Sequence, residues 1–394
     1  MQGEGLSLQE DVFYVMPIEL SEGGDSRYLV TMPPGIGDTV AVGLSAIDQI
    51  IRNDRDAAGK IDVLCNRKQA EVFACDPRIH RLIIVRSTLF PSGEGTFLRG
   101  IFPGQQVQPL VRFLRSQRYE AVVPGMPAPT FFYLLGLPVM FASLPDLGKD
   151  ILALHEARDR HISYLTRKVV NAFFKDALPP PELEEAIPLY LTAKHVRAAR
   201  LLMDVYRGRS DDRVLLVAPD TSSVVTRPPT PLLLAGIGEA LARDERLRVV
   251  ILPAYTLPEA ADQLYKGLKR DAAGRVFRIM EDQLPDLLTT TALIDQADLF
   301  LCGDTGLMHL AIALKLLSEP AEEQPRNQTR VIVLFGGTNP CFFGYSTRSV
   351  ILGRNRKEQR MLVPGIAKEL YDRRERDFFD HIEPAAITAA LLAK

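Results

Sequence analysis

The feature of the sequence that most constrains the fold is a repeated alternation of short apolar runs with amphipathic stretches. Runs of four to seven residues rich in Val, Ile and Leu, such as "IDVLCN" (61–66) and "RVLLVAP" (213–219), are each followed by a segment with helical spacing. Strands that are apolar on both faces and joined through helices are typical of parallel sheets built from β-α-β units. The alternation therefore predicts an α/β fold.

The same alternation occurs on both sides of a proline-rich segment. Three consecutive prolines in "ALPPPELEEAIPLYL" cannot continue a helix, and 394 residues exceed one ordinary hydrophobic core. We therefore predict two Rossmann-like, doubly wound parallel-sheet domains. Because ligands of such sheets bind at the carboxyl ends of the strands, we expect the two domains to face a cleft. The predicted boundaries are 1–180 for the first domain, 181–192 for the linker, 193–370 for the second domain and 371–394 for C-terminal helices. Whether these helices cross back to the first domain is left open.

The periodicity also predicts individual elements. The expected strands are 27–32, 61–66, 81–85, 119–124, 213–219, 247–253, 276–280, 298–303 and 330–335. Two expected helices, 39–54 and 306–317, follow glycine-containing turns, and the polar segment 318–329 is expected to be an exposed loop.

Composition excludes several classes of function. A net charge of −2 gives no global field for nucleic acid or an anionic membrane. The N-terminus does not resemble a secretory signal, and no run reaches the roughly 20 apolar residues that span a bilayer. The four cysteines form no C-x-x-C pair, so we expect buried free thiols, no zinc site or disulfide frame, and a reducing cytoplasm. They are Cys65, Cys75, Cys302 and Cys341.

The segment "LFLCGDTGLMHLAIAL" (299–314) places an Asp-Thr-Gly triplet between a predicted strand and a predicted helix. An aspartic protease would need a second such loop in a β-rich domain, and the triplet occurs once. Glycines at 303 and 306 allow a close backbone approach, and the amides at a helix start are unpaired donors that bind anions. A phosphate site is therefore predicted, while a simple helix cap by Asp304 stays open.

Two further turns have a similar composition. "MPPGIGDTVAVG" (32–43) places Gly35 and Gly37 after a strand and Asp38 at a helix start, where simple helix capping also stays open. A dinucleotide fingerprint would require glycine or alanine at Val40, so a nicotinamide-dependent dehydrogenase is disfavoured but kept as an alternative. "VIVLFGGTNPCFFGY" (331–345) ends a third strand in a loop of small residues.

Together, "GIGDTVAVGLSAIDQI", "LIDQADLFLCGDTGLMHLAIAL" and "VIVLFGGTNP" resemble, in order and spacing, the heptosyltransferases of glycosyltransferase family nine. The resemblance extends over most of the chain. It implies a GT-B fold and inverting transfer of a heptose or related sugar from a nucleotide diphosphate, ADP-heptose, to an acceptor hydroxyl, without a cofactor. It also implies that Asp38 is the catalytic base and that the donor diphosphate is held by Asp304, Thr305, Gly306, Leu307 and His309. From the turns themselves we further expect Gly35 and Gly37 to form an acceptor-side loop, and Arg227, Gly337 and Thr338 to contact the donor. No metal is expected: metal-dependent transferases commonly use an Asp-x-Asp triplet to share an ion with the diphosphate, and we recognise no such triplet here.

One departure from the family pattern affects the expected donor site. The family has a Lys shortly before a Trp-Pro, whereas "APDTSSVVTRPPTP" contains no Lys and the chain contains no Trp. Arg227 is the nearest cation, and a degenerate nucleotide-sugar-binding protein without turnover is a second alternative. A glycan, lipid-linked, protein or small-molecule acceptor is expected, with no nucleic acid partner and with peripheral membrane contact left open.

Overall fold

The structure, a computed structural model, describes residues 13–18, 26–32, 35–85, 108–123, 161–180, 187–338, 340–353 and 378–393. The chain divides into two compact units. The first comprises Met1–Leu147 and Arg167–Pro179, and the second comprises Gly148–Thr166 and Pro180–Lys394. Helix α8 (Ile162–Asn171) contributes residues to both units. No helix in the described ranges has the length and apolar character needed to cross a membrane.

The first unit is built on a five-stranded sheet with the order β1-β4-β3-β2-β5. Its strands are β1 (Phe13–Pro17), β2 (Tyr28–Thr31), β3 (Ile61–Cys65), β4 (Ile79–Val85) and β5 (Ala121–Val123). The four predicted strands pair in parallel. Strand β1, which the sequence did not predict, adds an antiparallel edge beside β4.

The helical segment after β2 differs from the single helix predicted over 39–54. It begins with α1 (Ile36–Asp38), continues as a π-helical segment (Thr39–Leu44) and ends as α2 (Ser45–Asn53). Gly43 lies in the π-helical segment, where a Cβ would stand 2.9 Å from Cε of Met32 and 3.6 Å from Cζ of Phe73. The missing side chain therefore lets Met32 pack directly against the helix.

The other helices of this unit are short. They are a 3-10 turn (Arg55–Ala57), α3 (Arg67–Phe73) and α5 (Gln108–Ser116). Helix α3 begins with a reciprocal capping box between Asn66 and Gln69, which satisfies two amides at its start.

The second unit is built on a six-stranded parallel sheet with the order β13-β12-β10-β7-β8-β9. Its strands are β7 (Arg213–Ala218), β8 (Leu247–Ile251), β9 (Val276–Arg278), β10 (Leu299–Gly303), β12 (Arg330–Leu334) and β13 (Ser349–Leu352). All five strands predicted in this part of the sequence are present, and β13 was not predicted. The central strands are buried on both faces, as expected for a doubly wound sheet.

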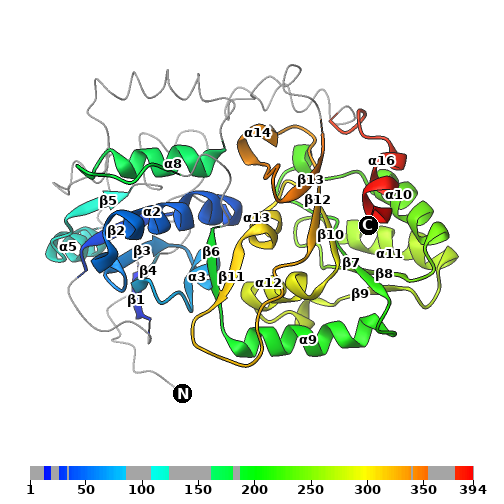
Figure 1. Ribbon diagram of the computed structural model, residues 1–394, viewed down its shortest axis with the longest axis horizontal. Coiled ribbons are helices and arrows are strands. Elements are labelled where there is room, and N and C mark those ends of the chain that lie inside the picture. Colours follow the sequence, from blue (N-terminus) through cyan, green and yellow to red (C-terminus); the bar gives the residue numbers. More distant parts are fainter. Residues whose placement is uncertain are drawn as a thin grey trace. The chain divides into compact units, whose positions relative to one another are not determined.

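Helices cover both faces of this sheet (Figure 1). Helices α10 (Thr230–Arg243), α11 (Pro258–Asp271) and α16 (Pro384–Leu392) lie on one side. Helices α9 (Ala193–Arg207) and α12 (Leu287–Gln296) lie on the other. Shorter helical segments are Val224–Thr226, Glu281–Gln283, α13 (Gly306–Ile312) and α14 (Pro340–Phe343).

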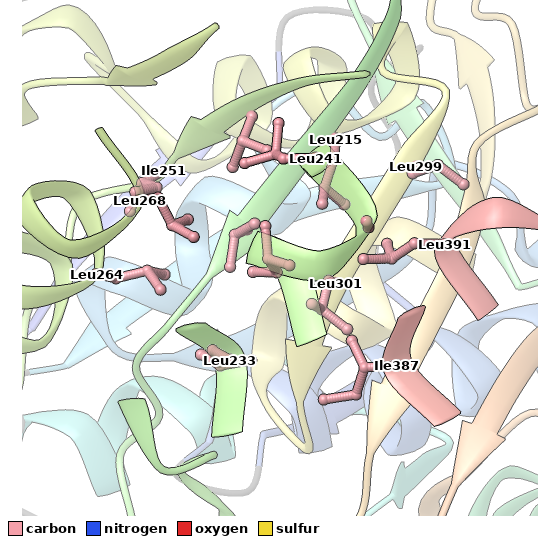
Figure 2. Close-up of a cluster of buried hydrophobic side chains, with 14 of the residues drawn as sticks. Leu215, Leu233, Leu241, Ile251, Leu264, Leu268, Leu299, Leu301, Ile387 and Leu391 are labelled. Carbon is pink, nitrogen blue, oxygen red and sulfur yellow. The ribbon is translucent and has the colours of Figure 1, made fainter. Parts of the chain in front are cut away.

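The core beneath α10, α11 and α16 is mainly aliphatic (Figure 2). Leu215 and Leu301 of the sheet belong to the same buried cluster as Leu241 of α10 and Leu264 of α11. Helices α10 and α16 approach closely because residue 236 is glycine: a Cβ there would stand 2.7 Å from Cβ of Ile387. The C-terminal helix α16 therefore packs within the second unit.

The helix predicted over 306–317 is wrong in its second half. Helix α13 ends at Ile312, and β11 (Leu314–Leu317) pairs in parallel with β6 (Pro188–Leu191), a strand inside the predicted linker. The side chain of Asn327 also accepts from the Lys315 amide and donates to its carbonyl, at 2.9 Å each. Partners outside this segment thus provide the backbone hydrogen bonds that a longer helix would have made internally.

Each sheet has one point at which the direction of winding reverses. In the first unit, the chain proceeds from β2 through β3 to β4, and β5 then lies on the other side of β2. In the second, it proceeds from β7 through β8 to β9, and β10, β12 and β13 then build outward from the other side of β7. Ligands of doubly wound sheets bind at the carboxyl ends of strands at such switch points. The switch point lies after β2 in the first unit, and after β7 and β10 in the second.

Candidate functional site

Three loops meet at the switch point of the second unit. They are residues 219–229 after β7, Asp304 and Thr305 after β10, and residues 335–338 after β12. A Cβ on Gly303 would collide with the carbonyl oxygen of Thr226 and stand 2.8 Å from Cδ of Pro228. The amide of Gly337 donates to the carbonyl of Val225 at 2.9 Å. The loop after β7 is therefore packed against both of its neighbours, and glycine is needed for this approach.

The Asp-Thr-Gly triplet forms the sharp turn from β10 into α13. Thr305 occupies the N-cap position with an extended backbone (φ −147°, ψ 161°), and its side chain makes no capping hydrogen bond. Asp304, Thr305, Gly306 and Leu307 are partly exposed, whereas the helix is buried from Met308 onward. The Thr305 hydroxyl is thus not used for capping, and Asp304 is not the N-cap residue. Gly306 is the first helical residue, so no left-handed backbone is needed there.

His309 lies beneath this turn and is only 4% exposed. Its Nδ1 is 2.8 Å from the hydroxyl of Tyr345, and its Nε2 is 3.9 Å from Oδ1 of Asp304. Burial, with a smaller contribution from His161, lowers the pKa of His309 to about 3. At neutral pH the ring is therefore uncharged, and it lies under the turn rather than on its exposed side.

Arg227 is held by an acidic residue that the sequence analysis missed. Its Nε donates to Oδ1 of Asp220 at 2.8 Å, and its Nη2 donates to the carbonyl of Thr221 at 2.9 Å. Oδ2 of Asp220 accepts from the amides of Thr256 and Leu257. Asp220 therefore fixes the guanidinium and also joins the loops that follow β7 and β8. Sequence reasoning had considered Arg227 only as a replacement for the expected Lys.

Gly336 and Gly337, which follow β12, allow close packing against the loop after β7. A Cβ on Gly336 would stand 2.7 Å from the carbonyl oxygen of Val225, and one on Gly337 would stand 3.0 Å from Cβ of Val225. Gly337 and Thr338, both predicted to bind the donor, are half-buried, and Gly337 lies against the loop after β7. Their placement brings the three loops together at one edge of the sheet.

In the first unit, the switch point carries Asp38. The side chain bends back toward Gly35, where a Cβ would stand 2.9 Å from Oδ2 of Asp38. Burial raises the pKa of the Asp38 carboxyl above its usual range. Gly35, not Asp38, is the N-cap of α1, and no side chain caps that helix. Gly37 lies within α1. A half-buried carboxylate with a raised pKa at a strand's carboxyl end is suited to accept a proton.

The expectation that the chain has no Asp-x-Asp triplet is wrong, because one occurs at Asp54-Arg55-Asp56 in the first unit. Asp54 accepts hydrogen bonds from Arg27 at 2.6 Å, from the hydroxyl of Tyr28 at 2.8 Å and from the amide of Asp56 at 3.1 Å. This triplet therefore caps a turn and pairs with a strand residue. In the ranges that the structure describes, no group of three or more His, Cys, Asp or Glu side chains is arranged to hold a metal ion.

Two further histidines and the cysteines have structural surroundings. His195 forms a capping box with Thr192 at the start of α9, and His161 is buried against Tyr345 with ring centroids 4.3 Å apart. His155 and most of the basic segment 353–360 lie outside the described residues. The cysteines are free thiols; Cys65, Cys75 and Cys302 are buried and Cys341 is half-buried.

Comparison with known proteins adds a family and a fold. Residues 285–364, which contain the Asp-Thr-Gly turn, match the model of glycosyltransferase family 9 (heptosyltransferase). No curated protein matches the chain in sequence.

Three solved structures resemble the chain over most of its length. The E. coli ADP-heptose lps heptosyltransferase II is 16% identical, with 93% of this chain and 97% of that one covered and a TM-score of 0.61. A family 9 glycosyl transferase from Veillonella parvula DSM 2008 is 14% identical, with 94% and 97% covered and a TM-score of 0.64. E. coli heptosyltransferase WaaC with ADP is 15% identical, with 88% and 99% covered and a TM-score of 0.54. These likenesses confirm the predicted GT-B fold with two Rossmann-like units.

Proposed function

We propose that this chain, a glycosyltransferase belonging to glycosyltransferase family 9, transfers a heptose or related sugar from a nucleotide-diphosphate donor to an acceptor hydroxyl. ADP-heptose is the proposed donor. Two of the similar solved structures support this choice, since one is described as an ADP-heptose heptosyltransferase and another as a heptosyltransferase with ADP.

The observation that carries the proposal is the position of two acidic turns in the two sheets. Asp38 follows β2, and Asp304 follows β10; each is at the switch point of its own unit. A nucleotide diphosphate is a natural ligand for the second turn, because its amides and the Thr305 hydroxyl supply hydrogen-bond donors. An acid with a raised pKa, such as Asp38, is the natural base for an acceptor hydroxyl.

In the proposed reaction, Asp38 takes the proton of the acceptor hydroxyl as its oxygen attacks the anomeric carbon of the sugar. The new carbon–oxygen bond forms on the face opposite the diphosphate. The bond from the anomeric carbon to the phosphate oxygen breaks, and the nucleoside diphosphate leaves. Attack from the opposite face inverts the configuration. The helix-start amides and Arg227 stabilise the charge on the leaving diphosphate.

This stabilisation makes a metal ion unnecessary in the proposed mechanism. Activity should therefore survive EDTA, and activity lost in EDTA and restored by magnesium or manganese would contradict metal independence. Acceptors of several classes could supply the hydroxyl that Asp38 deprotonates: a glycan, a lipid-linked sugar, a protein or a small metabolite. A reducing cytoplasm is the proposed location, because the cysteines are free thiols.

Donor binding can be tested separately from turnover. Isothermal titration calorimetry with ADP and ADP-heptose should give saturable binding to the wild type and weaker binding to Arg227→Ala. Loss of any binding to the wild type would overturn the proposed donor.

One observation favours the second candidate, a nucleotide-sugar-binding protein without turnover. Arg227 replaces the Lys of the family pattern and is already paired with Asp220, which reduces its charge toward a diphosphate. Binding of ADP-heptose with neither transfer nor hydrolysis, across acceptors of every proposed class, would establish this alternative.

A further inference from the structure

Beneath the Asp304 turn lies a buried group of three aromatic rings that the proposed mechanism does not use. His309, Tyr345 and His161 are 4%, 2% and 5% exposed. They come from three separate segments: α13, the loop after α14, and the residue preceding α8. Tyr345 lies at the centre, with ring centroids 5.5 Å from His309 and 4.3 Å from His161.

The backbone at Tyr345 is firmly anchored. Its carbonyl accepts from the amide of Arg348 at 2.9 Å and from both the amide and the hydroxyl of Ser349 at 2.8 Å. Ser349 is the first residue of β13, so these bonds tie Tyr345 to the sheet. The ring of His161, which packs on Tyr345, is fixed in turn by Ser163, whose hydroxyl is 2.6 Å from its Nδ1. The Tyr345 hydroxyl is therefore presented to His309 from a rigid support.

The contacts of His309 select one of its two neutral forms. The ring is uncharged, so only one nitrogen carries a proton. Nε2 faces the carboxylate of Asp304 at 3.9 Å, and an ionised carboxylate only accepts hydrogen bonds. A proton on Nε2 makes this approach attractive, whereas a lone pair there would repel the oxygen. Nδ1 is then the acceptor for the Tyr345 hydroxyl at 2.8 Å. The bond made by one ring nitrogen thus decides which nitrogen is protonated.

We propose that Tyr345 is a positioning residue for the donor sugar: its hydroxyl holds His309 as the Nε2-protonated tautomer, and His309 orients the Asp304 carboxylate toward a sugar hydroxyl. The inference rests on the proposed function in assigning the turn to a nucleotide sugar. In this proposal, the contact with Asp304 is made by the sugar and not by the ADP moiety. Loss of the Tyr345 hydroxyl should therefore affect the sugar more than the nucleotide.

The tautomer is tested first, in the unliganded full-length protein. Nitrogen-15 NMR of labelled histidine distinguishes a protonated from an unprotonated ring nitrogen, and His309→Gln assigns the signals. We expect Nε2 of His309 to be protonated and Nδ1 to be an unprotonated acceptor. In Tyr345→Phe, the Nδ1 signal should move toward that of a free imine nitrogen. Protonation at Nδ1 in the wild type, or an unchanged spectrum in the variant, would overturn the proposal.

The second test separates sugar from nucleotide. In Tyr345→Phe, we expect the KM for ADP-heptose to rise about tenfold, the scale of one lost hydrogen bond, with ADP affinity changing less than about twofold. Tyr206→Phe is a matched control, because Tyr206 is a buried tyrosine of α9 that packs on Phe277. It should leave both quantities unchanged.

The outcomes of the two tests can be told apart. An equal loss of ADP and ADP-heptose affinity in Tyr345→Phe, or no change in either, would contradict the positioning role. Failure of the wild type to bind ADP-heptose would instead refute the proposed function, and the NMR result would still decide whether Tyr345 sets the tautomer.

Discussion

The carboxylate of Asp38 bends back so far that a Cβ on Gly35, three residues earlier, would stand 2.9 Å from its Oδ2. The amide and hydroxyl of Thr39 both bond to the Gly35 carbonyl, at 2.9 and 2.8 Å, so the turn is closed around this contact. Glycine at position 35 thus leaves the room that this orientation of the proposed base occupies.

Gly35→Ala should displace the Asp38 carboxylate and lower turnover at least tenfold, while ADP binding stays unchanged. Steady-state transfer and calorimetry measure the two effects. Gly238→Ala is a suitable control, because a Cβ there would meet only Cδ2 of Leu268 at 3.9 Å. Wild-type turnover in Gly35→Ala would show that the carboxylate need not occupy this position.

The raised pKa of Asp38 predicts opposite pH trends for activity and stability. A base works when ionised, so activity should rise with pH through the folded-state pKa, which lies above the usual Asp value. The folded state binds this proton more tightly than the unfolded state. The stabilisation from Asp38 is therefore complete below the unfolded pKa and is lost as pH rises through the folded pKa.

Asp38→Asn should consequently be more stable than the wild type at neutral pH, with the difference vanishing in acid. Thermal unfolding of both proteins between pH 3 and pH 8 (roughly the window over which a raised Asp pKa would act) measures it. An Asn variant that is less stable at neutral pH would mean that the carboxylate has stabilising partners.

Substitution of Thr305 distinguishes two roles for its side chain, a contact with the ligand and a cap of α13. Its side chain makes no capping bond in α13, so Thr305→Ala should leave the melting temperature unchanged and cost about 1 kcal/mol of ADP affinity. Asp286→Ala is the contrasting control, because Asp286 accepts from the amide of Thr289 as the cap of α12 and its loss should cost about 1 kcal/mol of stability. Unchanged affinity combined with lost stability in Thr305→Ala would make Thr305 only a cap.

Gly303 is predicted to be a packing glycine rather than a ligand residue. Gly303→Ala would force the backbone of Thr226 away from β10 and should destabilise the protein by about 1–3 kcal/mol. Because Arg227 follows Thr226, donor affinity should fall as well. Chemical denaturation and ADP calorimetry check the two effects; a variant as stable as the wild type would show that the loop after β7 tolerates displacement.

Local sequence signals predicted most of the two main sheets but little of what holds the site. The interior strands were predictable because successive residues, such as Phe300 and Leu301, point to opposite faces of the sheet and are both apolar. A parallel sheet that is covered on both faces requires this pattern. Strand β11 was missed because "LKLL" continues the helical spacing of α13, and its partner β6 is more than 120 residues away. Tertiary pairing overrode the local pattern.

The predicted site residues were found from strand–glycine–helix turns, which are local signals. Tyr345 and Asp220 were missed because their partners His309 and Arg227 are 36 and 7 residues away, and no motif links either pair. The depth of His309 was also not predictable, since a histidine one turn into a helix is compatible with either face. Only the packed loops determine which side chains are covered.

The most direct test of the proposed function is release of ADP from ADP-heptose, measured with wild type and Asp38→Asn in the presence of candidate acceptor hydroxyls. We predict acceptor-dependent release by the wild type, and release reduced about 10²- to 10⁴-fold in Asp38→Asn with the affinity for ADP-heptose unchanged by calorimetry. Equal release by the two proteins, or no release by the wild type with any acceptor although ADP-heptose binds, would contradict Asp38-dependent sugar transfer.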